Sequence, residues 1–98
     1  MRLTQSEIEA IKKSYLDVFQ GGSIYLFGSR VDDNQKGGDI DLYIVPNTEL
    51  PSSALLEKKL NFLVQVKNAI GEQKIDVVIA RDKQRLIEQE ALQKGIKL

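Results

Sequence analysis

Two short acidic patterns in the sequence have the residue types and spacing that divalent-cation chemistry needs. Asp39 and Asp41 flank one residue at the start of an apolar run, and Asp76 stands inside the apolar run Ile75–Ile79. Side chains alternate between the two faces of a strand, so Asp39 and Asp41 share a face, with Cα atoms about 6.5–7 Å apart. If the two strands are neighbours, three carboxylates converge. Converging anions are unfavourable unless a cation neutralises them.

The composition restricts which cation that is. The 98 residues include no Cys and no His, so neither thiolate nor imidazole can bind a metal. Oxygen must supply the ligands, which favours Mg²⁺, Mn²⁺ or Ca²⁺. Two Mg²⁺ ions about 3.5–4 Å apart suit three carboxylates and can hold a phosphoryl group during transfer.

A candidate phosphate site precedes the aspartates. Gly28 and Ser29 follow directly on the apolar run Ile24–Phe27. Gly28 lets the backbone approach a ligand closely. Ser29 offers a hydroxyl and a backbone N–H to a phosphate oxygen, and Arg30 can add positive charge. These three residues are therefore the candidate nucleotide-binding residues.

Each of these features also has an ordinary structural explanation. A Gly-Ser pair after a strand is most often a turn, and an Asp-x-Asp on a strand is usually a solvated face. Asp76 would fit an edge strand with one face in water, and Arg30 would fit exposed surface. Their combination, in this order and on these elements, is far less expected by chance than any one of them.

The apolar spacing along the chain predicts helices packed on a small sheet. The fold class is α+β, with a mixed three-stranded sheet and the order α-β-β-α-β-α. The predicted elements are a helix capped by Thr4 and Glu7 and stopped by Gly21, strands over 24–27 and 39–45, a helix with Leu56, Leu60, Leu63, Val66 and Ile70 on one stripe, a strand over 74–80, and a helix over 82–94 with Leu86, Ile87, Ala91 and Leu92 as its apolar positions. Residues 30–38 are predicted to form a loop.

Length and charge narrow the class of protein. A chain of 98 residues fits one domain over 1–98. Lys plus Arg is 14 and Asp plus Glu is 14, so the net charge is zero and nucleic acid is not the expected partner. We find no signal peptide and no apolar stretch long enough to span a membrane. We therefore expect a cytoplasmic protein without membrane contact.

The chain resembles the DNA polymerase β-like nucleotidyltransferase superfamily, and within it the minimal nucleotidyltransferases (MNT domains), in the runs Leu26–Arg30, Gly38–Leu42 and Ile75–Val78. The resemblance covers nearly the whole chain. It implies that Ser29 contacts the triphosphate, that Asp39 and Asp41 bind the metals, and that Asp76 completes the site and helps to activate the acceptor hydroxyl. The chain departs from the family's pattern only between Gly28 and Asp39, a stretch one residue shorter than the common form.

The resemblance also implies a function. We expect Mg²⁺-dependent transfer of AMP from ATP to a hydroxyl of a partner protein. Many family members pair with a small helical HEPN protein in a toxin–antitoxin system, where the MNT protein is the antitoxin. Three alternatives stay open: an antitoxin that acts by binding and occlusion without catalysis, a nucleotidyltransferase for a small molecule whose pocket a homo-oligomer closes, and an unrelated α+β domain with a coincidental acidic face.

Overall fold

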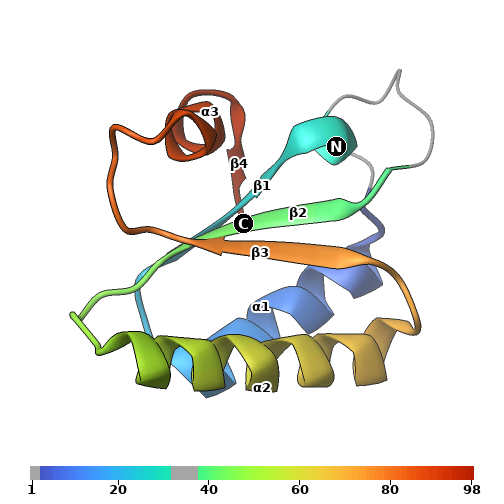
Figure 1. Cartoon of the computed structure of the whole chain (residues 1–98). Helices are drawn as coiled ribbons and strands as arrows, with labels where there is room; N and C mark the ends of the chain where they lie inside the picture. Colours follow the sequence, from blue (N-terminus) through green and yellow to red (C-terminus); the bar gives the residue numbers. More distant parts are fainter. Residues whose placement is uncertain (1–2, 32–37) are drawn as a thin grey trace.

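The computed structural model describes residues 3–31 and 38–98, without the side chain of Ser29. Its elements are α1 (Gln5–Phe19), β1 (Ser23–Phe27), the 3₁₀ helix η1 (Gly28–Val31), β2 (Ile40–Val45), α2 (Ser52–Ile70), β3 (Ile75–Ile79), α3 (Leu86–Lys94) and β4 (Ile96–Lys97). The sheet lies in the middle, with α1 and α2 below it and α3 above it (Figure 1). Of the predicted loop over 30–38, residues 32–37 lie outside the described part. No described helix combines the length and apolarity that crossing a bilayer requires.

The sheet is mixed, as predicted, but it has four strands. Their order is β3-β2-β1-β4, with β2 parallel to β3 and the other two pairs antiparallel. The prediction of three strands was wrong because the chain beyond α3 returns to the sheet, where Ile96 pairs with Leu26. A strand of two residues is too short to show the alternation by which strands are recognised in a sequence.

The start of α1 is fixed by the predicted capping box. The Glu7 N–H donates to Thr4 Oγ1 at 3.1 Å, and the Thr4 N–H donates to Glu7 Oε1 at 2.9 Å. These two bonds satisfy donors that the first turn of a helix otherwise leaves unpaired. The helix ends at Gln20, which takes a left-handed conformation with φ of 61°. The chain then turns into β1, which leads directly to Gly28.

The main core lies between the sheet and the α1–α2 layer. Ile40, Leu42 and Ile44 of β2 are fully buried there, which confirms the predicted alternation along this strand. The predicted apolar stripe of α2 was partly wrong. Leu56 and Leu60 are more than half exposed, whereas Phe62, outside the stripe, is fully buried together with Val66 of the stripe. The five predicted apolar residues spread over a wider arc of the helix surface than the arc that packs on the sheet, so some of them remain exposed.

The last helix differs most from the prediction. It begins at Leu86 rather than at 82, and Leu86, one of its predicted apolar positions, is 83% exposed. Its buried residues are Glu88 and Ala91, and Ala91 packs with Phe27 and Tyr43 on the second face of the sheet. The apolar spacing did not predict the buried face of this helix, because the residue that points toward the sheet is Glu88 and not an apolar residue.

Glu88 is fully buried because every partner it needs is present. Its carboxylate accepts hydrogen bonds from the Tyr43 hydroxyl at 2.8 Å, from the Arg81 and Asp82 N–H groups at 3.1 and 2.9 Å, and from Arg85 at 3.3 Å. Burial by itself raises the pKa of a carboxyl, but these bonds outweigh it and hold the pKa of Glu88 below its usual value. The connection from β3 to α3 is therefore bound to the sheet through one anion.

Candidate functional site

The centre of the candidate site is Asp41, on the face of the sheet that α3 partly covers. In the register of the strands it lies beside Phe27 of β1 and beside Asp76 of β3. Neighbouring strands are about 4.8 Å apart, so the carboxylates of Asp41 and Asp76 rise from adjacent positions on one face. Asp41 is half-buried and Asp76 is exposed. The predicted pairing of these two aspartates across neighbouring strands is thus present.

The lack of a side chain at Gly28 leaves space for the Asp41 carboxylate. The φ angle of Gly28 is 75°, which disfavours any residue with a Cβ atom. A Cβ atom at this position would also collide with the Asp41 carboxylate. The sequence suggested that Gly28 is needed where a ligand approaches the backbone. The structure shows that a carboxylate of the chain itself already makes such an approach.

Asp39 lies just before β2 and has a partner of its own. The Lys74 ammonium contacts Asp39 Oδ2 at 3.3 Å, and the Lys74 side chain is 73% exposed. Because of this hydrogen bond, and because of the negative charges of Asp39 and Asp76, the pKa of Lys74 is raised. Lys74 therefore supplies the positive charge next to the aspartates.

The charges around Asp41 act on its protonation. Burial raises the pKa of Asp41, and the negative charges of Asp76, Asp39 and Glu90 raise it further, while Lys74 lowers it. The net effect is a raised pKa. Sequence reasoning missed both Glu90 and Lys74. Lys74 could have been noticed two residues before Asp76, whereas Glu90 reaches the site only through the packing of α3 on the sheet.

The remaining predicted residues lie at the end of β1. Gly28, Ser29 and Arg30 form most of η1, directly beside Asp41. The Arg30 guanidinium donates to the Gly38 carbonyl and to Gln73 Oε1, both at 3.4 Å. Arg30 therefore joins the end of β1 to the segments that precede β2 and β3.

The site has the oxygen donors that a cation needs, but they do not surround a common position where a cation could bind. Among the residues that the structure describes, which include all three aspartates, no group of three side chains is placed to hold a metal ion. The Asp39 carboxylate contacts the Lys74 ammonium instead. The donor chemistry still fits a hard cation, because all ligands are oxygen and because burial, together with the neighbouring carboxylates, raises the pKa of Asp41, which a bound cation would counteract.

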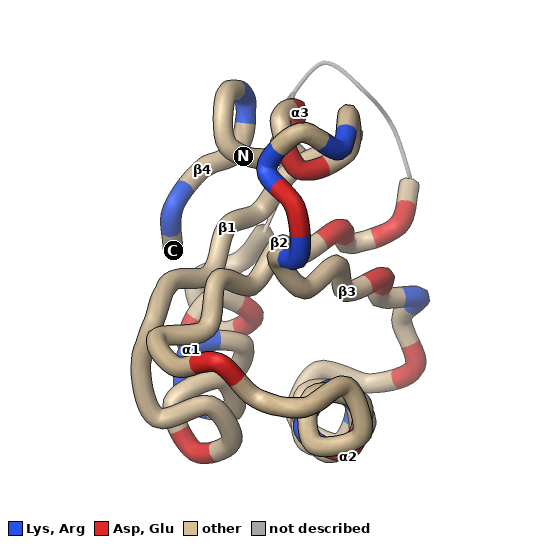
Figure 2. Tube along the Cα trace, turned by 60° about the vertical axis from the view of Figure 1, so that its left-hand side comes forward, with Lys and Arg blue, Asp and Glu red and all other residues tan. Residues whose placement is uncertain are grey.

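The charges of the chain are mixed rather than gathered in one field. Figure 2 shows basic and acidic segments interspersed along the trace. The connection that precedes α3 carries basic segments on both sides of an acidic one. A long track of positive charge, which phosphate backbones require, does not emerge from the described part of the chain.

Comparison with known proteins adds a family and a fold. Residues 6–98 match the family model described as polymerase beta, nucleotidyltransferase. Four chains of solved structures match this fold. One belongs to the crystal structure of the toxin–antitoxin MntA-HpeT with two Asp-to-Glu substitutions, at a TM-score of 0.67 and 22% identity over 93% of this chain and 70% of that chain. Such an identity shows a common fold and no more. No curated protein matches the sequence.

Proposed function

Because this chain belongs to the polymerase β nucleotidyltransferase family, we propose that it transfers AMP from ATP to a hydroxyl group of a partner protein, with Mg²⁺ bound by Asp39, Asp41 and Asp76. The observation that carries the proposal is the pair of adjacent carboxylates, Asp41 and Asp76, next to the turn at Gly28. Two carboxylates on neighbouring strands beside a close backbone turn suit the binding of a metal and a triphosphate together.

The reaction divides among these residues. The acceptor oxygen forms a bond to the α-phosphorus of ATP, the bond to the bridging oxygen breaks, and pyrophosphate leaves. Asp76 would take the hydroxyl proton, and its exposure on the outermost strand supports this role. Ser29 and the Gly28 backbone bind phosphate oxygens, with Arg30 adding charge. Bound Mg²⁺ supplies neutralisation of the phosphate charge.

A protein is the acceptor that best suits this site. Asp76 is exposed at the rim of an open sheet, whereas sites for small molecules usually enclose most of their ligand. A docked protein would supply the missing wall and exclude water. The likeness to a chain of the toxin–antitoxin MntA-HpeT structure supports a partner protein. A helical HEPN-type partner in the cytoplasm is what the family resemblance implies.

The test is transfer to the product of the neighbouring gene. The protein is incubated with labelled ATP, Mg²⁺ and that product, and mass spectrometry locates any added AMP. We expect the modification on a hydroxyl of the partner, and we expect Asp41→Asn to abolish it. Asp17→Asn, a change of an exposed aspartate on α1, is the matched control and should transfer normally. Efficient transfer to a small molecule without any partner would contradict the proposal.

Metal binding is tested separately by calorimetric titration with Mn²⁺ and ATP. The double variant Asp39→Asn/Asp41→Asn should lose the Mn²⁺ binding that depends on nucleotide, because two of the three oxygen ligands lose their charge. Unchanged Mn²⁺ binding in this variant would show that the metal has been assigned to the wrong residues.

A second candidate function is neutralisation of a partner by binding alone. The ion pair of Lys74 with Asp39 favours it, because it already compensates part of the charge that a metal would otherwise neutralise. The two functions separate in one experiment. A binding protein neutralises its partner equally well as wild type and as Asp41→Asn, whereas an enzyme loses neutralisation with this change.

A further inference from the structure

The outer edge of β3 has hydrogen-bonding groups that the sheet does not use. The Lys74 carbonyl accepts from the Ile40 N–H, and the Ala80 N–H donates to the Ile44 carbonyl, at 3.1 and 2.8 Å. Backbone groups of alternate residues point to opposite sides of a strand. Val77 therefore directs its N–H and carbonyl groups away from β2. Since β3 is the outermost strand of the described sheet, these groups face no neighbouring strand.

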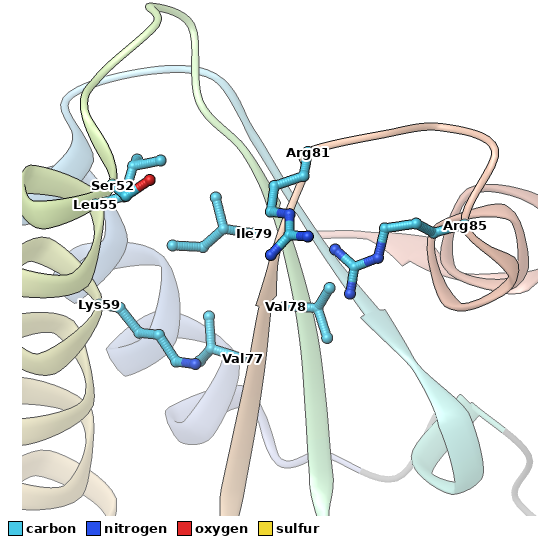
Figure 3. Close-up of a pocket in the computed structure, with 8 residues that line it drawn as sticks. All are labelled: Ser52, Leu55, Lys59, Val77, Val78, Ile79, Arg81 and Arg85. Atoms are coloured by element: carbon cyan, nitrogen blue, oxygen red, sulfur yellow. The ribbon is translucent and has the colours of Figure 1, made fainter.

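A groove runs along this edge, between α2 and the connection to α3. Its volume is about 320 Å³, and its apolar floor includes Leu55, Val77 and Ile79. Figure 3 shows Leu55 and Lys59 on one side, and the guanidinium groups of Arg81 and Arg85 projecting toward Val78 from the other. The groove is thus an apolar channel with a backbone edge along it.

The rim of the groove is cationic. Lys59, Arg81 and Arg85 line it, and no carboxylate does. Of the three, only Arg85 forms an ion pair in the described part of the chain, with Glu88 at 3.3 Å. The whole chain has zero net charge, so Lys59 and Arg81, in a groove that no carboxylate lines, are a local excess of positive charge. Grouped cations repel each other unless an anion lies between them.

The rim is also held in place before any ligand arrives. The buried carboxylate of Glu88 accepts from the Arg81 N–H at 3.1 Å and from the Arg85 guanidinium at 3.3 Å. The Arg85 guanidinium is therefore anchored at the rim, and the backbone of Arg81 is fixed beside it while the Arg81 side chain stays exposed. Anchored groups lose less conformational entropy when they bind a partner.

We propose that this groove binds an extended acidic segment of a partner protein, which adds a strand to the open edge of β3 while its carboxylates pair with Lys59, Arg81 and Arg85. Added strands gain affinity from backbone hydrogen bonds and specificity from alternate side chains. Neither an RNA nor a free phosphate uses the alternating backbone groups of a strand edge. The inference stands without catalysis, because a protein that only binds its partner needs such a surface too.

A second copy of this chain fits the edge less well. In an antiparallel pairing centred on Val77, Arg81 of one copy would lie opposite Gln73 of the other, and the second groove would bring its own Lys59, Arg81 and Arg85 to the shared edge instead of carboxylates. The location also suits a partner that carries an acceptor, because Asp76 lies two residues from Val78 on the same face of β3. A segment bound in the groove would thus start about 7 Å from the site, as two residues of a strand span.

The probe is a fluorescein-labelled peptide of ten residues that alternates valine and glutamate. We expect anisotropy to show binding that weakens with salt, and we expect the amide NMR signals of Val77 and Ile79 to shift. The double variant Lys59→Glu/Arg81→Glu should weaken binding at least tenfold. Lys12→Glu/Lys13→Glu on α1 makes the same change in net charge away from the groove and should bind normally. A peptide with N-methyl groups on alternate residues should bind more weakly, because it cannot complete the strand.

Several results would overturn the inference. If the amide NMR signals of Val77 and Ile79 do not shift at about 1 mM peptide, the free energy of binding is weaker than about 4 kcal/mol, and the site is excluded. Equal binding of a valine–lysine peptide, or equal loss in the α1 control, would remove the role of the rim. A single-stranded RNA that binds through Arg81 where the acidic peptide does not would assign the groove to nucleic acid. A dimer in sedimentation that Lys59→Glu/Arg81→Glu dissociates would assign it to a second copy.

Discussion

Replacing Gly28 with alanine tests whether this glycine exists to make room for Asp41. The φ of 75° disfavours alanine, and a left-handed conformation costs about 1–2 kcal/mol. The new methyl group would also collide with the Asp41 carboxylate, and forced displacement of a packed group costs about 1–3 kcal/mol. The two effects add to a loss of about 2–5 kcal/mol in the free energy of unfolding.

The chain offers a matched control at Gly71. Its φ is also positive, at 92°, but a Cβ atom there would meet nothing within 4 Å. Gly71→Ala should therefore lose only a conformational part, about 1–3 kcal/mol, because its φ of 92° with ψ of −174° is a region almost restricted to glycine. Urea unfolding followed by circular dichroism measures both variants in the same buffer. Gly71→Ala sets the scale of a loss that is conformational only, and the cost of displacing Asp41 is isolated by a further variant.

A third variant completes the experiment. In Gly28→Ala/Asp41→Ala the carboxylate is gone, so the excess loss at Gly28 should disappear, leaving a coupling energy of about 1–3 kcal/mol between the two positions. If Asp41→Ala restores none of the stability lost in Gly28→Ala, this explanation of Gly28 is refuted.

Three further changes test other parts of the structure. Glu88→Gln should lower the free energy of unfolding at pH 7 by about 1–3 kcal/mol. Because folding lowers the pKa of Glu88, the stabilisation is present above pH 4.5, the ordinary pKa of a glutamate, and is lost as the pH falls through the folded value. The unfolding curves of the two proteins should therefore converge in acid. Lys74→Gln should strengthen Mn²⁺ binding in a calorimetric titration, because Asp39 is released from its ion pair; weaker binding would show that Lys74 supports the metal. Ser29→Ala should weaken ATP binding by about 1–3 kcal/mol in the presence of Mg²⁺, and unchanged affinity would remove this residue from the phosphate site.

The sequence predicted the parts of the fold that depend on local patterns. The capping box at Thr4 and the alternation around Leu42 are confirmed, because each arises from residues close together in the chain. The pairing of Asp41 with Asp76 also followed, since β2 and β3 are neighbours as assumed. The ion pair of Asp39 with Lys74 was not predicted, because the sequence alone does not show which basic side chain lies next to Asp39 once β2 and β3 are paired.

The errors gather where tertiary contacts override the local pattern. The apolar spacing of the last helix favoured Leu86, yet the sheet accepts Glu88, because Tyr43 offers a hydroxyl there. The start of that helix was placed too early for a related reason. Asp82 forms a turn instead, in which its carboxylate accepts the Gln84 N–H at 2.9 Å. Exposed Leu56 and Leu60 show that apolar residues exceed what one sheet face can cover.

The attachment of α3 through Glu88 also determines how the molecule opens. Only Glu88 and Ala91 of this helix are buried, so little apolar surface resists its detachment, and segments of this kind open locally at a lower free energy than the whole fold. When α3 detaches, Arg81 and Arg85 lose their common anchor. Binding of a partner in the β3 groove should therefore slow the amide hydrogen exchange of α3, although the partner contacts a different element.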